Sequence, residues 1–426
     1  MNLRRRGGTA AVSVLVLFVA ALAGCGTDRP PGAGGPSASK LGFTRYKSAV
    51  QWPAVDDYVP AGMGLRVLAP LGSCALGIGT YRNGYRDVTA NWTGNASCTR
   101  LSINPAPGSG SDDRPEGPPS QTGGWMGGGV PGVAAVPWPD GSLLVVGTRV
   151  IRRDAQGDYQ DLADLKLPQP VGSEGAETAD QGQADDAIRV GDRLLISGGE
   201  YLNQVESPFL MASDDAGRTV RRVPLPTANG AQPTSPMGPM AADGNQVVAA
   251  GAAATNAFDD APTGSVPIWH SADGGSHWTV TTLDGVPAGT RFNGVLHAGG
   301  IWFAVGGYHA GAERTDMPLM FTSRDGVHWA RTDTKAMGSG AIMAATLDAG
   351  GRPVLLGRLT VPSNAHKKLV TFCGMVWLGS GAATGWQRGE LDCDDAPGQA
   401  LLTLSTGRVL IAGNRTLWIS GAARRD

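Results

Sequence analysis

The chain has 426 residues, including 64 glycines and 29 prolines, and only 17% of its residues are charged. This composition implies many turns and few long solvated helices, so it favours an all-β fold. The formal net charge of −2 provides no basic field that would attract nucleic acid, and we expect no nucleic-acid partner.

The first 24 residues have the features of an export signal. Three arginines at positions 4–6 precede an apolar run, Ala10 to Ala23, which is shorter than the ~20 residues that a spanning helix needs. The run ends in Leu-Ala-Gly-Cys25, which resembles the lipobox of bacterial lipoproteins. That resemblance implies that residues 1–24 are a signal peptide and that Cys25 carries a lipid. The lipid would hold the exported protein on the outer face of the bacterial cytoplasmic membrane.

Residues 25–44 are rich in glycine, proline and serine and show no apolar periodicity. Such a segment cannot bury a core, so we expect a flexible tether between the lipid and the folded domain. The domain itself is expected to span residues 45–426. A segment of that length exceeds most single hydrophobic cores, unless the fold is modular.

A repeated unit runs through this domain. Each copy has a turn with glycine, a run of four to six apolar residues and a closing glycine, and a short strand precedes each turn. The closing glycines of the six clear copies are Gly147, Gly198, Gly251, Gly306, Gly357 and Gly413, and a weaker seventh copy ends at Gly79. The pattern predicts a hairpin of two short strands in every copy.

A second pattern, Ser/Thr-x-Asp-x-Gly-x-x-Trp, follows the hairpin. Its complete copy is Ser271–Trp278; the copy at Ser213–Val220 lacks the tryptophan, and the copy at Ser323–Trp329 is one residue short. The matching residues are Ser213, Asp215, Gly217, Ser271, Asp273, Gly275, Trp278, Ser323, Asp325, Gly326 and Trp329. The polar side chains suit a turn that closes a hairpin, and the tryptophan suits packing between blades.

These repeats resemble the Asp-box (BNR) repeats of sialidases, sortilin-type receptors and photosystem II assembly factors. The resemblance implies an all-β propeller of four-stranded blades, seven in number, or six if the first copy is an appendage. It also implies that the Asp-box carboxylates are structural and lie opposite the working mouth. Because few residues follow Ser420, we expect a segment such as Tyr46 to Val55 to complete the last blade.

The cysteine count suggests disulfide bonds. With Cys25 lipidated, four cysteines remain in an exported chain. Each neighbouring pair falls within one repeat length, which favours Cys74–Cys98 and Cys373–Cys393 over the other two connectivities.

Catalysis finds little support in the sequence. Resemblance to exo-sialidases would imply three arginines, a tyrosine with its glutamate, and an aspartate. The usual Arg-Ile-Pro motif is absent, Arg66-Val-Leu is a poor substitute, and no tyrosine lies in a family motif. The six histidines show no ligand spacing, so we expect no metal and no cofactor.

We therefore favour a binding or assembly scaffold for a protein or glycan, with an exo-sialidase-like glycosidase as the alternative. The mouth would be formed by loops between second and third strands and between blades. The candidate ligand-binding residues are Glu200, Tyr201, Asp259, Asp260, Tyr308, His309 and Arg314. Asp185 and Asp186 are expected in an acidic inter-blade loop. Ordinary solvated loops would look similar, because surface charge is common.

Overall fold

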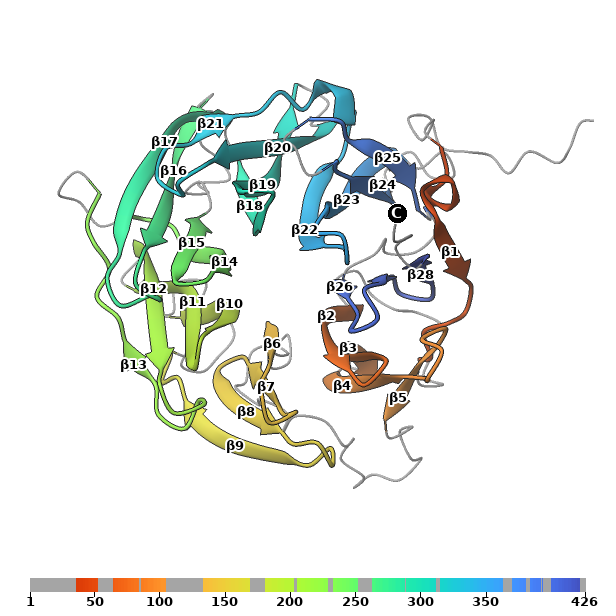
Figure 1. The fold of residues 1–426 in the computed structure, drawn as a ribbon, viewed down its shortest axis with the longest axis horizontal. Coiled ribbons are helices and arrows are strands. Elements are labelled where there is room, and N and C mark those ends of the chain that lie inside the picture. The colour runs from red at the N-terminus through yellow and green to blue at the C-terminus, as the bar shows by residue number, and fades with distance from the viewer. Residues whose placement is uncertain are drawn as a thin grey trace, which may run out of the picture.

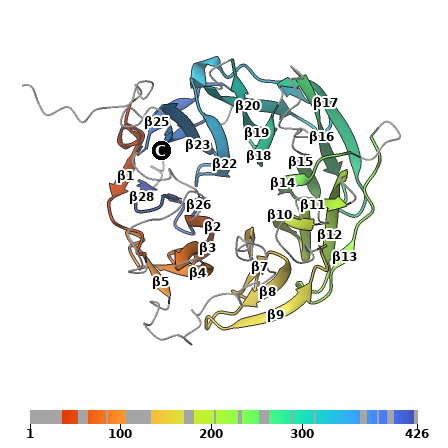
Figure 2. The ribbon, with the colours of Figure 1, turned by 180° about the vertical axis from the view of Figure 1, so that it is seen from behind.

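Seven four-stranded antiparallel sheets surround a central axis, and each sheet is one blade of a β-propeller (Figures 1 and 2). The computed structural model describes residues 36–52, 64–83, 86–104, 133–168, 181–202, 205–228, 233–251, 263–287, 289–311, 315–362, 370–380, 384–391, 393 and 400–421. The innermost strands contact one another all the way round the ring. The predicted all-β class and seven blades are confirmed.

The strands occupy four layers. The inner strands are β2 (Gly64–Leu71), β6 (Ala134–Pro137), β10 (Gln181–Val190), β14 (Met237–Asp243), β18 (Arg291–Ala298), β22 (Ala341–Leu347) and β26 (Ala400–Thr403). The second strands are β3 (Cys74–Asn83), β7 (Leu143–Val146), β11 (Arg193–Leu202), β15 (Gln246–Gly251), β19 (Ile301–Ala310), β23 (Pro353–Pro362) and β27 (Val409–Ala412).

The two outer layers complete each blade. The third strands are β4 (Arg86–Gly94), β8 (Arg149–Arg153), β12 (Val205–Ser213), β16 (Thr263–Ser271), β20 (Thr315–Ser323), β24 (Val370–Leu378) and β28 (Leu417–Ser420). The outermost strands are β5 (Leu101–Asn104), β9 (Tyr159–Asp164), β13 (Arg221–Arg222), β17 (Thr279–Pro287), β21 (Ala330–Arg331), β25 (Gln387–Glu390) and β1 (Phe43–Tyr46). Two short 3₁₀ helices, η1 (Ala38–Leu41) and η2 (Lys335–Met337), are too short to cross a membrane.

The core consists of seven hydrophobic clusters, one in each interface between neighbouring blades. The second strands explain why the repeat contains unbroken apolar runs. In β7, Leu143 and Val145 pack toward the first blade, while Leu144 and Val146 pack toward the third. Since successive side chains point to opposite faces and both faces are covered, every position is apolar.

In five of the seven blades the closing glycine of the repeat lies where the inner strand bulges. Gly198 pairs with Ala184, immediately before a bulge in β10, and a Cβ at Gly198 would lie 2.1 Å from the Gln183 carbonyl oxygen. At Gly306 the corresponding distance, to the carbonyl oxygen of Arg291, is 1.9 Å. Only glycine permits this close approach of two backbones. The inner strands β2, β10, β14, β18 and β22 all carry such an irregularity.

Residues 36–52 form a strap across three consecutive blades. At its start, the amide of Glu390 in the sixth blade donates to the Pro36 carbonyl at 2.8 Å. Next, β1 pairs antiparallel with β28 and becomes the fourth strand of the seventh blade. At its end, the amide of Leu101 in the first blade donates to the Ala49 carbonyl at 2.8 Å. The strap therefore closes the ring (Figure 1).

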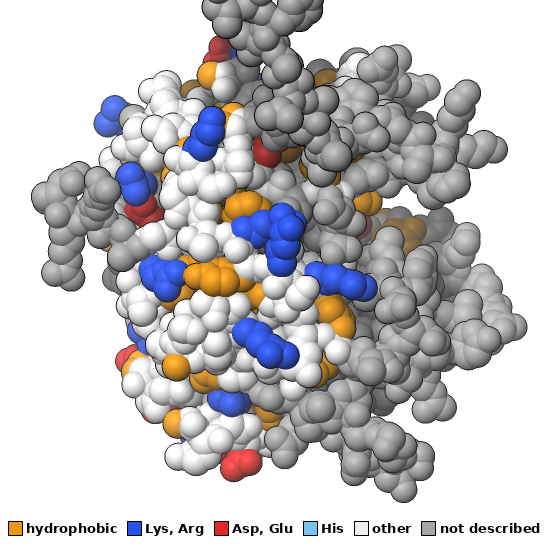
Figure 3. Space-filling model, turned by 90° about the vertical axis from the view of Figure 1, so that its right-hand side faces the viewer, with side chains coloured by type: hydrophobic (Ala, Val, Ile, Leu, Met, Phe, Trp, Pro, Cys, Tyr) orange, Lys and Arg blue, Asp and Glu red, His pale blue; other side chains and the backbone are white. Residues whose placement is uncertain are grey.

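The closing strand lies earlier than we expected. An N-terminal segment does complete the last blade, but β1 shares only Tyr46 with the predicted segment Tyr46 to Val55. Burial decides its position, because Ala38 and Phe43 are 0% and 2% exposed. Figure 3 views this side of the ring, where lysine and arginine side chains are more prominent than acidic ones.

Both predicted disulfides are present. Cys74 in β3 bonds Cys98 in the turn before β5, and Cys373 in β24 bonds Cys393 just after β25. Each bond lies within a single blade, as the spacing within one repeat suggested. Cys25 lies outside the described residues.

Candidate functional site

A pocket of about 430 Å³ lies in the central channel. Its lining comes mainly from the inner strands, near the end of the ring at which those strands begin. This is also the end of the inter-blade connections and of the loops between second and third strands. The expected mouth and the pocket therefore lie at the same end of the propeller.

The polar lining comes from alternate blades. Arg66 belongs to β2, Asp185 and Asp186 to β10, and Arg291 and Asn293 to β18. Asn293 is partly fixed, because its side-chain amide donates to the Ile342 carbonyl at 2.8 Å. Charged groups of both signs thus line the same pocket.

A few apolar side chains also line the pocket, although most of its accessible lining is polar. Met343, Ala344 and Ala345 of β22 line the pocket together with Leu401 of β26, and all four side chains are partly exposed. The pocket is therefore more polar than the usual small-molecule site, in which apolar side chains predominate.

Strand irregularities select the residues that face the pocket. The bulged residues of four inner strands are Arg66, Asp185, Asn293 and Met343, and all four line it. A bulge re-aims a side chain that regular pleating would place elsewhere. These residues were not among the ligand-binding residues predicted from the sequence. In these four blades the closing glycine was the available signal, because it pairs with the residue just before the bulge.

Two charged residues that line the pocket, Asp185 and Arg291, also influence Glu206, which does not line it. Burial raises the pKa of Asp185, and Arg291 partly opposes this effect. Burial also raises the pKa of Glu206, at the start of β12; the negative charge of Asp185 raises it further, and Arg291 lowers it. Asp185, Glu206 and Arg291 are therefore electrostatically linked.

Asp186 is held by two backbone amides. Its carboxylate oxygens accept hydrogen bonds from the amides of Ala187, at 2.8 Å, and Met240, at 2.7 Å. The second bond ties β10 to β14 in the next blade. Burial, with a smaller contribution from Asp185, raises the pKa of Asp186 to about 7, although both hydrogen bonds favour the ionised form.

The expected placement of Asp185 and Asp186 in an inter-blade loop is wrong. Both lie within β10, because the inner strand begins at Gln181, well before the apolar residues that revealed it in the sequence. The polar start of the strand faces the channel and therefore carries no apolar pattern.

The four described residues among the predicted ligand-binding set lie near the ends of β11 and β19, and none lines the pocket. Glu200 is buried and forms an ion pair with Arg222. Tyr201 is half-buried and pairs across the strands with Glu206.

In the fifth blade, Tyr308 packs against the guanidinium of Arg331, 5.7 Å from the ring centre. His309 lies 3.1 Å from the buried carboxylate of Asp316. The other three predicted residues, Asp259, Asp260 and Arg314, lie outside the described residues.

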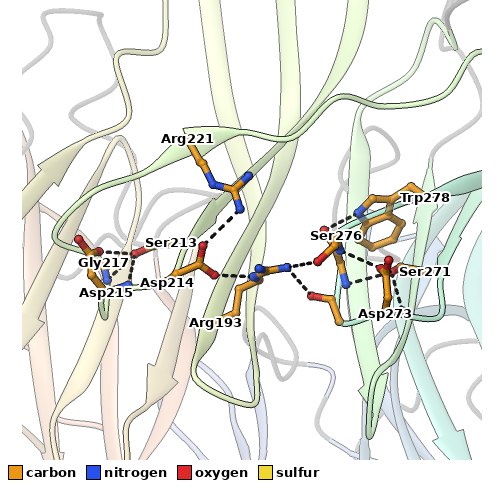
Figure 4. A network of polar contacts seen from close by, with 12 residues as sticks. Arg193, Ser213, Asp214, Asp215, Gly217, Arg221, Ser271, Asp273, Ser276 and Trp278 are labelled. Carbon is orange, nitrogen blue, oxygen red and sulfur yellow. Dashed lines mark hydrogen bonds and ion pairs between the residues drawn. The ribbon is translucent and has the colours of Figure 1, made fainter.

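The turn at residues 271–278 is closed by its own side chains (Figure 4). The Ser271 hydroxyl donates to Asp273 at 2.9 Å and accepts from the Gly275 amide at 2.9 Å. Asp273 accepts from the backbone amide and the ring of His277, which hold its pKa well below its usual range. The Trp278 indole donates to the Gly275 carbonyl at 3.0 Å.

The other two turns repeat this arrangement. The hydroxyls of Ser213 and Ser323 donate to Asp215 at 2.8 Å and to Asp325 at 3.0 Å. Hydrogen bonds lower the pKa of both carboxyls, mainly from the Thr219 amide in one turn and the His328 side chain in the other. All three turns follow third strands, at the end of the ring opposite the pocket.

Each of these turns also packs against the preceding blade. A Cβ at Gly275 would lie 2.6 Å from the Leu195 side chain of the third blade. Arg193 of that blade donates to Ser276 at 2.6 Å and to Asp214 at 2.6 Å, and Asp214 accepts from Arg221 as well (Figure 4). The carboxylates of the turns therefore bond within their own blade, whereas Arg193 joins two neighbouring blades through Ser276.

Within the described ranges, no three His, Cys, Asp or Glu side chains are grouped so that they could hold a metal ion.

No protein-family model matches this chain, and no curated protein is similar to it in sequence. Several solved structures are similar at low identity. Streptogramin B lyase has 8% identity and a TM-score of 0.44, over 89% of this chain and 98% of that one. The extracellular domain of a one-component system from B. thetaiotaomicron has 10% identity and a TM-score of 0.45, over 85% and 39%. An α-L-arabinanase from Penicillium chrysogenum has 14% identity and a TM-score of 0.39, over 89% and 97%.

Proposed function

We propose that this protein is a lipid-anchored scaffold of the bacterial cell envelope, with an Asp-box propeller that binds a protein or glycan without turning it over. The observation that carries the proposal is the channel pocket, in which charged groups of both signs lie beside a few apolar side chains. Such a pocket supports recognition of a ligand group that enters the channel mouth.

Binding fits the pocket better than sialidase-like catalysis. Two arginines, Arg66 and Arg291, line its described part, whereas a sialidase clamp needs three. No tyrosine is among those lining residues. Asp186, which has the raised pKa of a candidate acid, is held by two backbone amides. An exo-sialidase-like glycosidase remains the alternative function, because a carboxyl with a pKa near 7 could act as a general acid.

We predict that the purified full chain shows no turnover of fluorogenic sialosides or of a panel of other exo-glycoside substrates. The physical reason is that the described residues lining the pocket include neither a third arginine for a clamp nor a tyrosine nucleophile. The measurement is fluorophore release over hours at pH 5 and pH 7. Release that is lost in the Asp186→Asn variant would place catalysis in this pocket and reject the scaffold.

The anchor is proposed from the lipobox alone. We predict that Cys25→Ser moves the protein from the membrane fraction to the soluble fraction, because the lipid is the proposed attachment. Fractionation and immunoblotting measure this change. Thr27→Ala, two residues away, should stay with the membrane. Unchanged membrane retention of Cys25→Ser would reject lipid anchoring at this cysteine.

A further inference from the structure

The strap that closes the ring has a surplus of positive charge. Residues 36–52 include Lys40, Arg45 and Lys47 and contain no aspartate or glutamate. The two blades that meet at its end are also poor in acid, since Asp87 is the only acidic residue in the described ranges of the seventh and first blades. The whole chain has a net charge of −2, so this side of the ring departs from the overall composition.

Backbone contacts of the strap bring cations from three segments together. The amide of Ala49 donates to the Arg415 carbonyl in the seventh blade at 2.8 Å. The Ala49 carbonyl accepts from the amide of Leu101 in the first blade, also at 2.8 Å, and Leu101 follows Arg100. Lys47 lies two residues before Ala49. Lys47, Arg100 and Arg415 are all exposed, so three positive side chains surround this point of the strap.

Further cations lie along the rest of the strap. Lys40, in η1, is exposed, and the guanidinium of Arg45 lies 5.8 Å from the centre of the Trp418 ring. The side of the ring that Figure 3 shows accordingly has more basic than acidic side chains. We call the following residues the basic strap face: Lys40, Arg45, Lys47, Arg100 and Arg415.

Part of this charge is not neutralised by the folded domain. Lys40, Lys47 and Arg100 form no ion pair with any residue that the structure describes. A positive surface of this kind attracts anionic partners, and the attraction weakens as salt is added.

The strap is also where the proposed lipid anchor joins the folded domain. The Pro36 carbonyl accepts from the Glu390 amide of the sixth blade, which fixes the start of the strap. The segment from Cys25 to Pro36 spans at most about 40 Å, even at full extension. Figure 1 shows the strap on the outer rim of the ring, away from the channel. A lipid at Cys25 would therefore hold the propeller by this rim and keep the basic strap face close to the bilayer.

Closeness to the bilayer makes a modest attraction effective. Each lysine or arginine near an anionic bilayer binds it favourably, over a distance of about 10 Å at 0.1 M salt. Since the anchor already holds the protein at the membrane, this attraction costs no further association and serves to orient the ring. A lipid chain combined with a basic surface is a general form of stable attachment.

We propose that the basic strap face lies on the anionic lipids of the membrane that carries the anchor. The channel axis then runs along the bilayer surface, because the strap lies on the rim. Both mouths of the channel stay open to solution, and the pocket remains accessible to its ligand. This inference rests on the proposed function, since it requires the lipid at Cys25.

The test measures how fast individual lysines are acetylated by a water-soluble reagent. The intact lipoprotein is reconstituted into vesicles of phosphatidylcholine alone or with about 30% phosphatidylglycerol, and mass spectrometry reads each lysine. Lys40 and Lys47 should react about fivefold more slowly on the anionic vesicles, because the lipid covers them. Lys166 and Lys335, exposed in the second and fifth blades, should react equally on both. Sodium chloride at about 0.5 M should remove the difference.

A charge reversal outside the observed lysines tests the electrostatic cause. Arg100→Glu should reduce the protection of Lys40 and Lys47 to about twofold or less, because it replaces an attractive charge with a repulsive one. Arg324→Glu, at an exposed turn position of the fifth blade, is the matched control and should leave the protection unchanged. Thermal unfolding of both variants checks that the propeller is intact.

Unchanged reactivity of Lys40 and Lys47 on anionic vesicles, while the protein floats with them, would overturn the inference and leave the anchor standing. Equal slowing of all four lysines would also overturn it, since no face would then be preferred. Protection that persists at high salt would contradict its electrostatic basis. A protein that fails to float with either kind of vesicle would reject the anchor itself, and the inference would fall with it.

Discussion

A chain that begins at Lys47 is expected to lose cooperative unfolding, because it lacks the strand that closes the ring. Without β1, the seventh blade keeps three strands and β28 becomes an open edge. The deletion also removes Phe43, whose burial contributes about 3–5 kcal/mol, and the backbone hydrogen bonds to β28. Together these losses are comparable with the whole net stability of a domain, about 5–15 kcal/mol. A chain that begins at Pro36 retains the strap and should unfold in one transition.

A point substitution tests the packing of β1 without shortening the chain. Phe43→Ala should lower the free energy of unfolding by about 3–5 kcal/mol, because Phe43 is 2% exposed in the core between the sixth and seventh blades. Thr44→Ala, at the exposed neighbour on the same strand, should change it by about 0.5 kcal/mol or less. Urea titrations followed by tryptophan fluorescence measure both. Similar midpoints for the two variants would show that β1 does not hold the ring closed.

The second large effect concerns Asp186 and depends on pH. Its pKa is about 7 in the folded protein, against an ordinary value of 3.8. Between these values the folded state binds more protons than the unfolded state, so stability falls as pH rises from about 4 to about 7 and levels off above. The loss is at most about 4 kcal/mol, because Asp186 keeps partial exposure to solvent.

Asp186→Asn is expected to flatten this part of the pH profile. At pH 5 the variant should be less stable than the parent by about 1–3 kcal/mol, since an amide cannot accept hydrogen bonds from both Ala187 and Met240. At pH 8 the difference should shrink or change sign, because the variant has no buried charge. Urea unfolding at both pH values measures it, with Asp192→Asn in the exposed turn of the same hairpin as the control. Parallel profiles for parent and Asp186→Asn would contradict the raised pKa.

Local sequence patterns were enough to predict much of the fold. Unbroken apolar runs such as Leu143–Val146 marked the second strands, because both faces of those strands are buried against neighbouring blades. The closing glycines marked the blade period, and in five blades this is because only glycine fits against the bulged inner strand. The disulfide pairs followed from spacing, since each bond lies inside one repeat. These features depend on residues within a single blade.

Only the tertiary structure decided which strand closes the ring and which side chains line the channel pocket. The position of β1 depends on how Ala38 and Phe43 bury against the sixth and seventh blades, which no local pattern encodes. Arg66, Asp185 and Arg291 come from three blades and meet only because the ring places their inner strands around one axis. A bulged polar residue on a short strand has no periodicity to reveal which way it points. By itself, the sequence therefore determined the repeat, the blade and its covalent links, whereas the closed ring determined which side chains share a pocket.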